Sequence, residues 1–221
     1  CDGNAGPFAS IVAMGSAAPE ISPGTAVVFR EGTYAVTNLG LSQTGTADAP
    51  IQLLAYPGES PVLDGGFYGD AATYVDRVAV VASGKYLVIK GLEFVGCHRT
   101  CVLVTGQHVV VADNTLLGGV EDSLKTSVPN SDLYITRNHF SLPVGVGLNP
   151  EGSPEAIDGF QSTRVWITQN EFTDSDTSRG GWGTVVWFKA GSDTVYFYDN
   201  YVHDLHVTAA ATIMGGCCFN N

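Results

Sequence analysis

Three short segments of the chain supply carboxylates and lysines that could act together. Their charged residues are Glu121, Asp122, Lys125, Glu155, Asp158 and Lys189. Two carboxylates about 5 to 9.5 Å apart can hydrolyse a glycosidic bond, and Asp122 and Asp158 are the pair that could meet this spacing. A lysine can instead abstract a proton, provided that desolvation or a second cation leaves it partly deprotonated at the working pH. These residues therefore allow either hydrolysis or proton abstraction.

A tryptophan and the cysteines add further candidates. Trp182 lies in the glycine-rich loop 180–183, where an indole could stack on a sugar ring, whereas Trp166 and Trp187 lie in strand-like segments and are expected to be structural or surface-stacking aromatics. The five cysteines, at positions 1, 97, 101, 217 and 218, have no zinc-binding spacing. Cys97 and Cys101 are close enough to close a short loop, and free buried thiols are the alternative.

The first residues resemble the start of a mature bacterial lipoprotein. Cys1 is followed by the polar residues 2–4, and a lipoprotein leader is cut directly before an acylated cysteine. The resemblance implies a lipid anchor at Cys1, which would hold the protein at a membrane without spanning it. An ordinary thiol at this position is the alternative.

Composition bounds the classes of protein that remain. The 221 residues are 44% hydrophobic, which is enough apolar material for a folded core and excludes intrinsic disorder. A net charge of −12 argues against nucleic acid as a partner, because too few basic groups are present to displace counterions. No apolar run reaches the roughly 18 to 20 residues of a transmembrane span. Abundant Gly, Thr, Val and Ser favour an all-β protein.

The elements that position the charged segments come from a repeat. Segments 109–116, 133–140, 165–172 and 195–202 align without gaps as apolar, any, apolar, polar, polar, Asn, any, apolar, and a weaker copy at 87–94 has Leu92 at the Asn position. The shared asparagines are Asn114, Asn138, Asn170 and Asn200. From Leu92 the spacings are 22, 24, 32 and 30 residues, so each repeat is a coil that carries loops of different length.

Each repeat predicts three short strands. Alternating apolar residues before the asparagine indicate one strand, a short apolar run precedes it, and a third strand follows the bend at the asparagine. We expect the bend to use left-handed geometry at the asparagine and the four amides to stack as a ladder. Coils about 4.8 Å apart would then form three parallel sheets. A sandwich or a propeller would explain neither the spacing nor the asparagines.

This pattern resembles the right-handed parallel β-helix proteins of the pectate-lyase-like type. The resemblance rests on the asparagine column and on segments 24–34, 49–58 and 61–66, which look like the opening coils of such proteins. It implies an all-β, single-stranded, right-handed parallel β-helix (a solenoid) of about six to eight coils, with a short N-terminal cap and an incomplete last coil. We expect residues 1–24 to form the N-terminal segment and cap, and residues 25–221 the β-helix.

The resemblance also implies roles for residues. Polysaccharide lyases of similar fold abstract a sugar proton with Lys or Arg while calcium neutralises the uronate carboxylate, in a groove formed by the first strand of each coil and the loop before it. Lys189 would be the base, Lys125 its substitute and Arg179 a substrate clamp, with Trp182 as a substrate-binding platform. The calcium ligands would be Glu121, Asp122, Glu155 and Asp158. The chain departs from the family at Gly159, where a further acidic residue is expected.

Three function classes follow. The first is an extracellular or surface-anchored protein that binds and cleaves an acidic polysaccharide by β-elimination or hydrolysis, and the second is a non-catalytic glycan-binding module. The third is a structural or accessory subunit of a cell-surface or membrane-associated assembly, bound through its open C-terminal coil to another protein subunit. All three predict an extracytoplasmic location: secreted, or lipid-anchored at the bacterial cell surface or in the periplasm.

Overall fold

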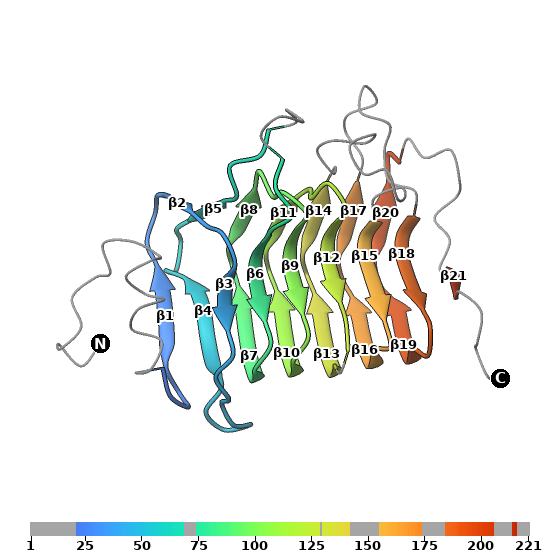
Figure 1. The fold of residues 1–221 in the computed structure, drawn as a ribbon, viewed down its shortest axis with the longest axis horizontal. Helices are drawn as coiled ribbons and strands as arrows, with labels where there is room; N and C mark the ends of the chain where they lie inside the picture. Colours follow the sequence, from blue (N-terminus) through green and yellow to red (C-terminus); the bar gives the residue numbers. More distant parts are fainter. Residues whose placement is uncertain are drawn as a thin grey trace.

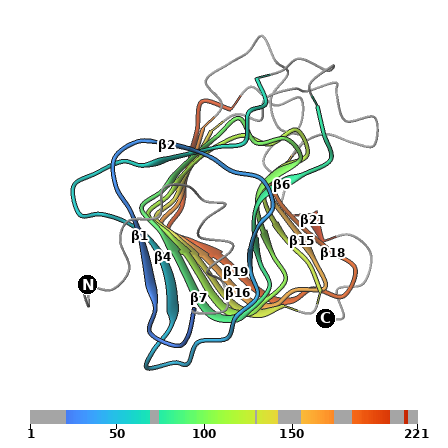
Figure 2. The same cartoon turned by 60° about the vertical axis from the view of Figure 1, so that its left-hand side comes forward.

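The computed structural model describes residues 21–68, 74–128, 130–141, 155–173, 184–205 and 214–215. These residues wind into a coil whose strands form three parallel sheets of seven strands each (Figure 1). Figure 2 shows the three-sided cross-section that results. The all-β solenoid predicted from the repeats is confirmed, and its seven coils lie within the expected range.

Each coil contributes one strand to each sheet, in the order A, B, C. Sheet A consists of β1 (Ala26–Phe29), β4 (Ile51–Ala55), β7 (Lys85–Lys90), β10 (Gln107–Ala112), β13 (Ser131–Thr136), β16 (Thr163–Thr168) and β19 (Asp193–Tyr198). Sheet B consists of β2 (Thr33–Ala35), β5 (Val62–Asp64), β8 (Glu93–Val95), β11 (Thr115–Leu117), β14 (His139–Ser141), β17 (Glu171–Thr173) and β20 (Tyr201–His203). Sheet C consists of β3 (Leu39–Leu41), β6 (Val78–Ala82), β9 (Thr100–Val104), β12 (Asp122–Thr126), β15 (Glu155–Phe160), β18 (Thr184–Lys189) and β21 (Met214–Gly215).

The core is a set of columns in which residues at one register position stack from coil to coil. In sheet B the buried column includes Leu63, Phe94, Leu116, Phe140 and Phe172, and the last two rings stack with centroids 4.9 Å apart. Because side chains alternate along a strand, the residues between these positions lie on the outer face. Each sheet therefore has one apolar face inward and one face available for function.

The four asparagines form a hydrogen-bonded ladder between sheets A and B. The Nδ2 of Asn114 donates to Oδ1 of Asn138 over 3.0 Å, Asn138 donates to Asn170 over 3.0 Å, and Asn170 donates to Asn200 over 3.1 Å. Each Nδ2 also donates to a strand carbonyl of the preceding coil. At the other end, the backbone N–H of Leu92 donates to Oδ1 of Asn114. The ladder thus satisfies backbone groups at every bend.

The left-handed residue of each bend precedes the asparagine, which differs from our expectation. The positive φ angles belong to Asp113, Arg137, Gln169 and Asp199, at 56°, 54°, 57° and 55°. The asparagine side chain has to turn inward to reach its neighbours, and the residue before it makes the change of direction. Consequently, the side chains of these preceding residues line the outer edge of the coil.

Some predicted features lie outside the described residues. These include the N-terminal cap, Cys1, and all of the last coil except β21, whose residues Met214–Gly215 pair with β18. The structure joins Cys97 to Cys101 in a disulfide between β8 and β9. Within the described ranges, none of the structure is a helix with the length and hydropathy that crossing a membrane requires.

Candidate functional site

The charged segments lie on three neighbouring strands of sheet C. Lys125 of β12 pairs in register with Asp158 of β15, which pairs with Trp187 of β18. The preceding register position is the buried column of Leu124, Ile157 and Val186. By strand alternation, Lys125, Asp158 and Trp187 therefore belong to the outer face of the coil.

Lys189 lies further along β18 than we predicted. We expected Lys125, Gly159 and Lys189 at equivalent positions, but Lys189 pairs with Phe160, and Gly159 pairs with Thr126 and Phe188. The turn after β18 contains one residue more than the turn after β15, and its Ala190 and Gly191 both have positive φ. Because of this extra residue, a position on β18 that is counted back from β19 is one register position off when it is compared with β15.

The two lysines nevertheless meet at one carboxylate. The Nζ of Lys125 lies 2.9 Å from Oδ2 of Asp158, and the Nζ of Lys189 lies 3.0 Å from Oδ1 of the same residue. The Lys189 ammonium also lies 4.2 Å from the centre of the Trp187 ring, a cation–π contact. The Asp158 side chain is 1% exposed, whereas the lysines keep 21% and 31% of their side-chain surface. We call Lys125, Asp158 and Lys189 the lysine row. Its two lysines are thus more accessible than its carboxylate.

Lys125 is held by more carboxylates than Lys189. Its Nζ lies 3.1 Å from Oδ2 of Asp122 and 3.7 Å from Oε2 of Glu121, in addition to Asp158. Burial alone would lower the pKa of Lys125, but the neighbouring carboxylates outweigh this effect and raise the pKa above its ordinary value. Lys125 is therefore a permanent cation at neutral pH.

Glu155 and Asp122 are neighbouring buried acids on β15 and β12. They pair in register, and both residues are buried. Burial raises the pKa of Glu155 strongly, and the carboxylates of Asp122 and Asp158 add to the shift. Burial raises the pKa of Asp122 as well, although Lys125 opposes this. At neutral pH, Glu155 is a protonated acid beside charged groups.

Two neighbours of the row were missed as functional candidates from the sequence. Trp187 was interpreted as a structural or surface-stacking aromatic, although its position two residues before Lys189 in a strand predicts a shared face. Arg99 forms an ion pair with Glu121 and another with Asp76 at 3.3 Å. Nothing in the sequence near Arg99 indicates this contact, because it joins residues from different coils.

Three of the four predicted calcium ligands contact a lysine in this arrangement. Among the residues that the structure describes, no group of three or more His, Cys, Asp or Glu side chains is placed to hold a metal ion. The ammonium of Lys125 instead contacts Glu121, Asp122 and Asp158, and Glu155 is protonated. A calcium ion needs six to eight oxygen ligands. The role of the four acids as calcium ligands stays a prediction.

Two predicted site residues cannot be placed in this row. Arg179 and Trp182 lie outside the described residues, in the segment 174–183 between β17 and β18. Their roles as substrate clamp and sugar platform stay predictions.

A model of the "Pel9A-like, right handed beta helix region" matches residues 2–143. The match covers more than half of the chain. The protein belongs to this Pel9A-like β-helix family. Its coil is accordingly right-handed, as the repeats and the resemblance to pectate-lyase-like proteins predicted.

Solved structures share the fold of this Pel9A-like chain at low sequence identity. An alginate lyase from Paenibacillus sp. str. FPU-7 is 16% identical with a TM-score of 0.52, and the match covers 91% of this chain and 98% of the lyase. Pectate lyase Pel9A is 15% identical with a TM-score of 0.56, covering 91% of this chain and 51% of the lyase. The GH136 lacto-N-biosidase from Eubacterium ramulus is 14% identical with a TM-score of 0.50, covering 88% and 52%.

These similarities establish the fold of the Pel9A-like chain, which it shares with solved lyases and a lacto-N-biosidase. The chain spans about half the length of pectate lyase Pel9A and of the lacto-N-biosidase. No curated protein matches it.

Proposed function

We propose that this protein binds an acidic polysaccharide along the outer face of sheet C and cleaves it by β-elimination. The observation that carries the proposal is the row of Lys125, Asp158 and Lys189 on three consecutive coils, with both lysine side chains partly exposed. Two cations on a face of an otherwise acidic protein suit a polymer that bears carboxylates. The solved lyases of similar fold, on pectate and on alginate, support this class of substrate.

The two lysines would divide the work. In β-elimination a base removes the proton beside the uronate carboxylate, a carbon–carbon double bond forms, and the glycosidic oxygen leaves. Lys125 would neutralise the uronate carboxylate, because its raised pKa keeps it charged. Lys189 would be the base, because it contacts one carboxylate where Lys125 contacts three. This division favours Lys189 over Lys125 as the base.

The test is turnover of a panel of polyuronates, followed by the ultraviolet absorbance of the unsaturated product. We expect Lys189→Ala to abolish product formation at a temperature at which thermal unfolding shows the variant to be folded, although the loss of one cation beside Asp158 should lower its melting temperature. Lys85→Ala removes an exposed lysine of sheet A and should leave the rate unchanged. Absence of turnover on every polymer, or an active Lys189→Ala variant, would contradict the proposal.

Hydrolysis is a second candidate, favoured by Glu155 and Asp122. Burial raises the pKa of Glu155 further than that of Asp122, and such separation is typical of an acid and a base in one site. The lacto-N-biosidase of similar fold supports this alternative. Hydrolysis would release new reducing ends without the absorbance of an unsaturated product, so the same assay distinguishes the two reactions.

We also propose an extracytoplasmic location. The Cys97–Cys101 disulfide supports it, because disulfides persist in oxidising compartments and are rare in the cytosol. A polymeric substrate is also met outside the cell. Mass spectrometry of native material would show whether Cys1 is acylated and whether a partner subunit accompanies the protein.

A further inference from the structure

The outer face of sheet A carries a row of aromatic side chains on its last three strands. Tyr134 of β13, Trp166 of β16 and Tyr196 of β19 pair in register. The Tyr134 and Trp166 rings stack with centroids 4.6 Å apart and the Trp166 and Tyr196 rings with centroids 5.7 Å apart. Each ring of this stack contacts a neighbouring ring, and each of the three strands is hydrogen-bonded to at least one neighbouring strand of sheet A. The stack is therefore held firmly in place.

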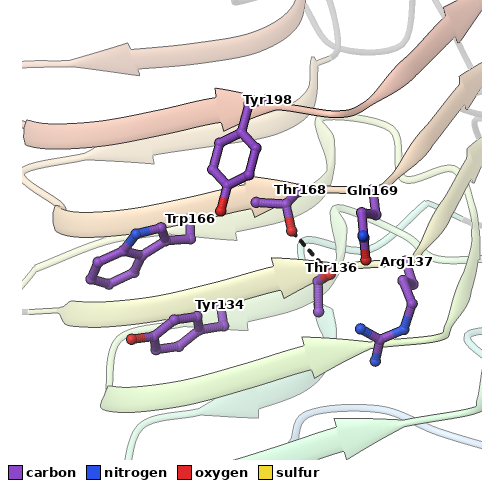
Figure 3. A pocket seen from close by; sticks show the side chains of 7 residues that line it. All are labelled: Tyr134, Thr136, Arg137, Trp166, Thr168, Gln169 and Tyr198. Atoms are coloured by element: carbon purple, nitrogen blue, oxygen red, sulfur yellow. Dashed lines mark hydrogen bonds between the residues drawn. The ribbon is translucent and has the colours of Figure 1, made fainter.

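Beside the stack lies a pocket of about 260 Å³ (Figure 3). Its lining consists of Tyr134, Thr136, Arg137, Trp166, Thr168, Gln169 and Tyr198. Figure 3 shows the Tyr198 ring on one side, reaching toward the strand of Trp166, and the Arg137 and Gln169 side chains at the far end. Thr136 and Thr168 lie between them and share a hydrogen bond of 3.1 Å.

The pocket offers one free ring face and several free polar atoms. Tyr198 is 51% exposed and takes part in none of the ring stacks found among the described residues. Its hydroxyl and the Gln169 amide have no hydrogen-bond partner in the described part of the chain. The Arg137 guanidinium donates through Nε and Nη2 to Asp113, over 2.7 and 3.0 Å, and Lys90 Nζ lies 3.5 Å from the same carboxylate. Neither of these two hydrogen bonds uses Nη1 of Arg137.

The coil geometry explains why these groups converge. Arg137 and Gln169 are the left-handed residues that precede ladder asparagines, so the Asn138 and Asn170 amides fix the bends on which they lie. Thr136, Thr168 and Tyr198 pair in register one position before those bends. A rigid scaffold with a ring face and several donors and acceptors is typical of a specific binding site.

We propose that this pocket is a second saccharide-binding site, which takes one sugar ring of a polysaccharide chain. The Tyr198 face would pack on the apolar side of the ring, and Gln169, Arg137 and the threonine hydroxyls would bond its hydroxyls. The site lies on a different sheet from the lysine row, so it would hold the polymer to the protein without taking part in cleavage.

A sugar fits this surface better than a second copy of the chain. A stable protein interface involves about 20 to 30 residues from each partner, whereas this pocket is lined by seven. Its volume is slightly below the range of about 300 to 1,000 Å³ that holds drug-sized ligands, which suits one sugar ring. Four of the seven lining side chains are threonine, arginine or glutamine, unlike the apolar core of an obligate dimer.

The experiment is affinity electrophoresis of the full chain through gels that contain polygalacturonate, alginate or neutral hydroxyethylcellulose. We expect at least one polymer to retard the wild type, and Tyr198→Ala to weaken the binding by about tenfold, as loss of a ring contact would. Tyr201→Ala is the matched control, because it removes a 63% exposed tyrosine from sheet B. It should leave the retardation unchanged, and so should Gln43→Ala outside the pocket.

Lys189→Ala separates this site from the proposed catalytic face. The variant should keep the Tyr198-dependent retardation even though it loses product formation, so either proposal can fail alone. Equal retardation of the wild type and Tyr198→Ala, or no retardation by any of the three polymers, would overturn the inference. So would light scattering that shows a dimer which Tyr198→Ala dissociates, because the aromatic row would then be a protein interface.

Discussion

Asp158 is the residue on which the proposed chemistry depends most. It is 1% exposed, and the two lysines that flank it are its ion-pair partners. A buried carboxylate without its cations is costly, so the lysines fix the carboxylate and the carboxylate fixes both ammonium groups. The distance between the two cations is therefore set by one side chain, which no spacing in the sequence reveals.

Glu155 gives a prediction about pH. Its pKa is raised in the folded protein by burial first and by the Asp122 carboxylate second, so the folded state binds a proton that the unfolded state releases near pH 4 to 5. Stability should therefore fall as the pH rises from that range toward the raised pKa. Glu155→Gln removes this dependence, and its melting temperature should exceed that of the wild type increasingly between pH 5 and pH 8.

Thermal unfolding across that pH range would check this. Glu93→Gln is the control, because Glu93 lies at the start of a sheet B strand and is only half-buried. A constant difference between Glu155→Gln and the wild type at every pH would contradict the prediction.

At the scale of the strand and the bend, the asparagine ladder could be predicted from the sequence, and the register of sheet C could not. The asparagines recur at one position of a fixed pattern, so their stacking follows from the pattern. Lys189 was displaced by a single turn residue, because the pattern that aligns sheet A does not count residues in the turn before it. Where turns differ in length between coils, the spacing of residues in the sequence no longer predicts their register in the sheet.

The ladder predicts that an inner rung matters more than an outer one. Asn138→Ala removes the acceptor for the N–H and Nδ2 of Asn114 and the donor to Val111, leaving buried polar groups unpaired. Each such group costs about 1 to 3 kcal/mol, so we expect a loss of several kcal/mol in the free energy of unfolding. Asn200→Ala, at the partly exposed end, should cost less. Urea unfolding of both variants would measure this, and equal losses would contradict it.

The packing of β15 against β18 explains why a glycine occupies position 159. A Cβ at this position would overlap the Phe188 ring, its register partner on β18. Gly159→Ala should therefore displace Phe188 and lower the free energy of unfolding by about 1 to 3 kcal/mol. Gly40→Ala on β3 of the same sheet is the control, since a Cβ there meets nothing within 4 Å. Equal effects of the two substitutions, measured by urea unfolding, would show that overpacking is not the cause.

At the scale of the whole molecule, the repeat predicted the winding, the number of sheets and the approximate number of coils. The roles of Arg179, Trp182 and Cys1 stay predictions, because the relevant segments lie outside the described residues. Glu121, Asp122 and Asp158 share one lysine partner in the structure, which the sequence did not indicate, and their role as calcium ligands stays a prediction. A sequence shows which charges exist and not how neighbouring coils pair them.

The disulfide gives a prediction for the stability of the whole chain. Cys97 and Cys101 close a loop with a sequence separation of 4, and both are buried. A loop this short stabilises the folded chain by about 2 kcal/mol through the entropy of the unfolded state. The Cys97→Ala, Cys101→Ala double variant should unfold at a correspondingly lower urea concentration, and reductant should lower the stability of the wild type alone. No effect of reductant would contradict the prediction.

Leu92 marks a boundary within the coil. After it, each bend is tied to the next by side-chain amides of the ladder. The bends of the first two coils are instead joined by the ion pair of Arg30, an exposed side chain, with Glu59 and by the Glu31 N–H, which donates to Glu59. Because each coil touches only its neighbours, the two halves do not share the reinforcement by the ladder. Backbone amide protons of the coils before Leu92 should therefore exchange with solvent before those near Asn138. Local unfolding should begin in the coils that lack the asparagine ladder.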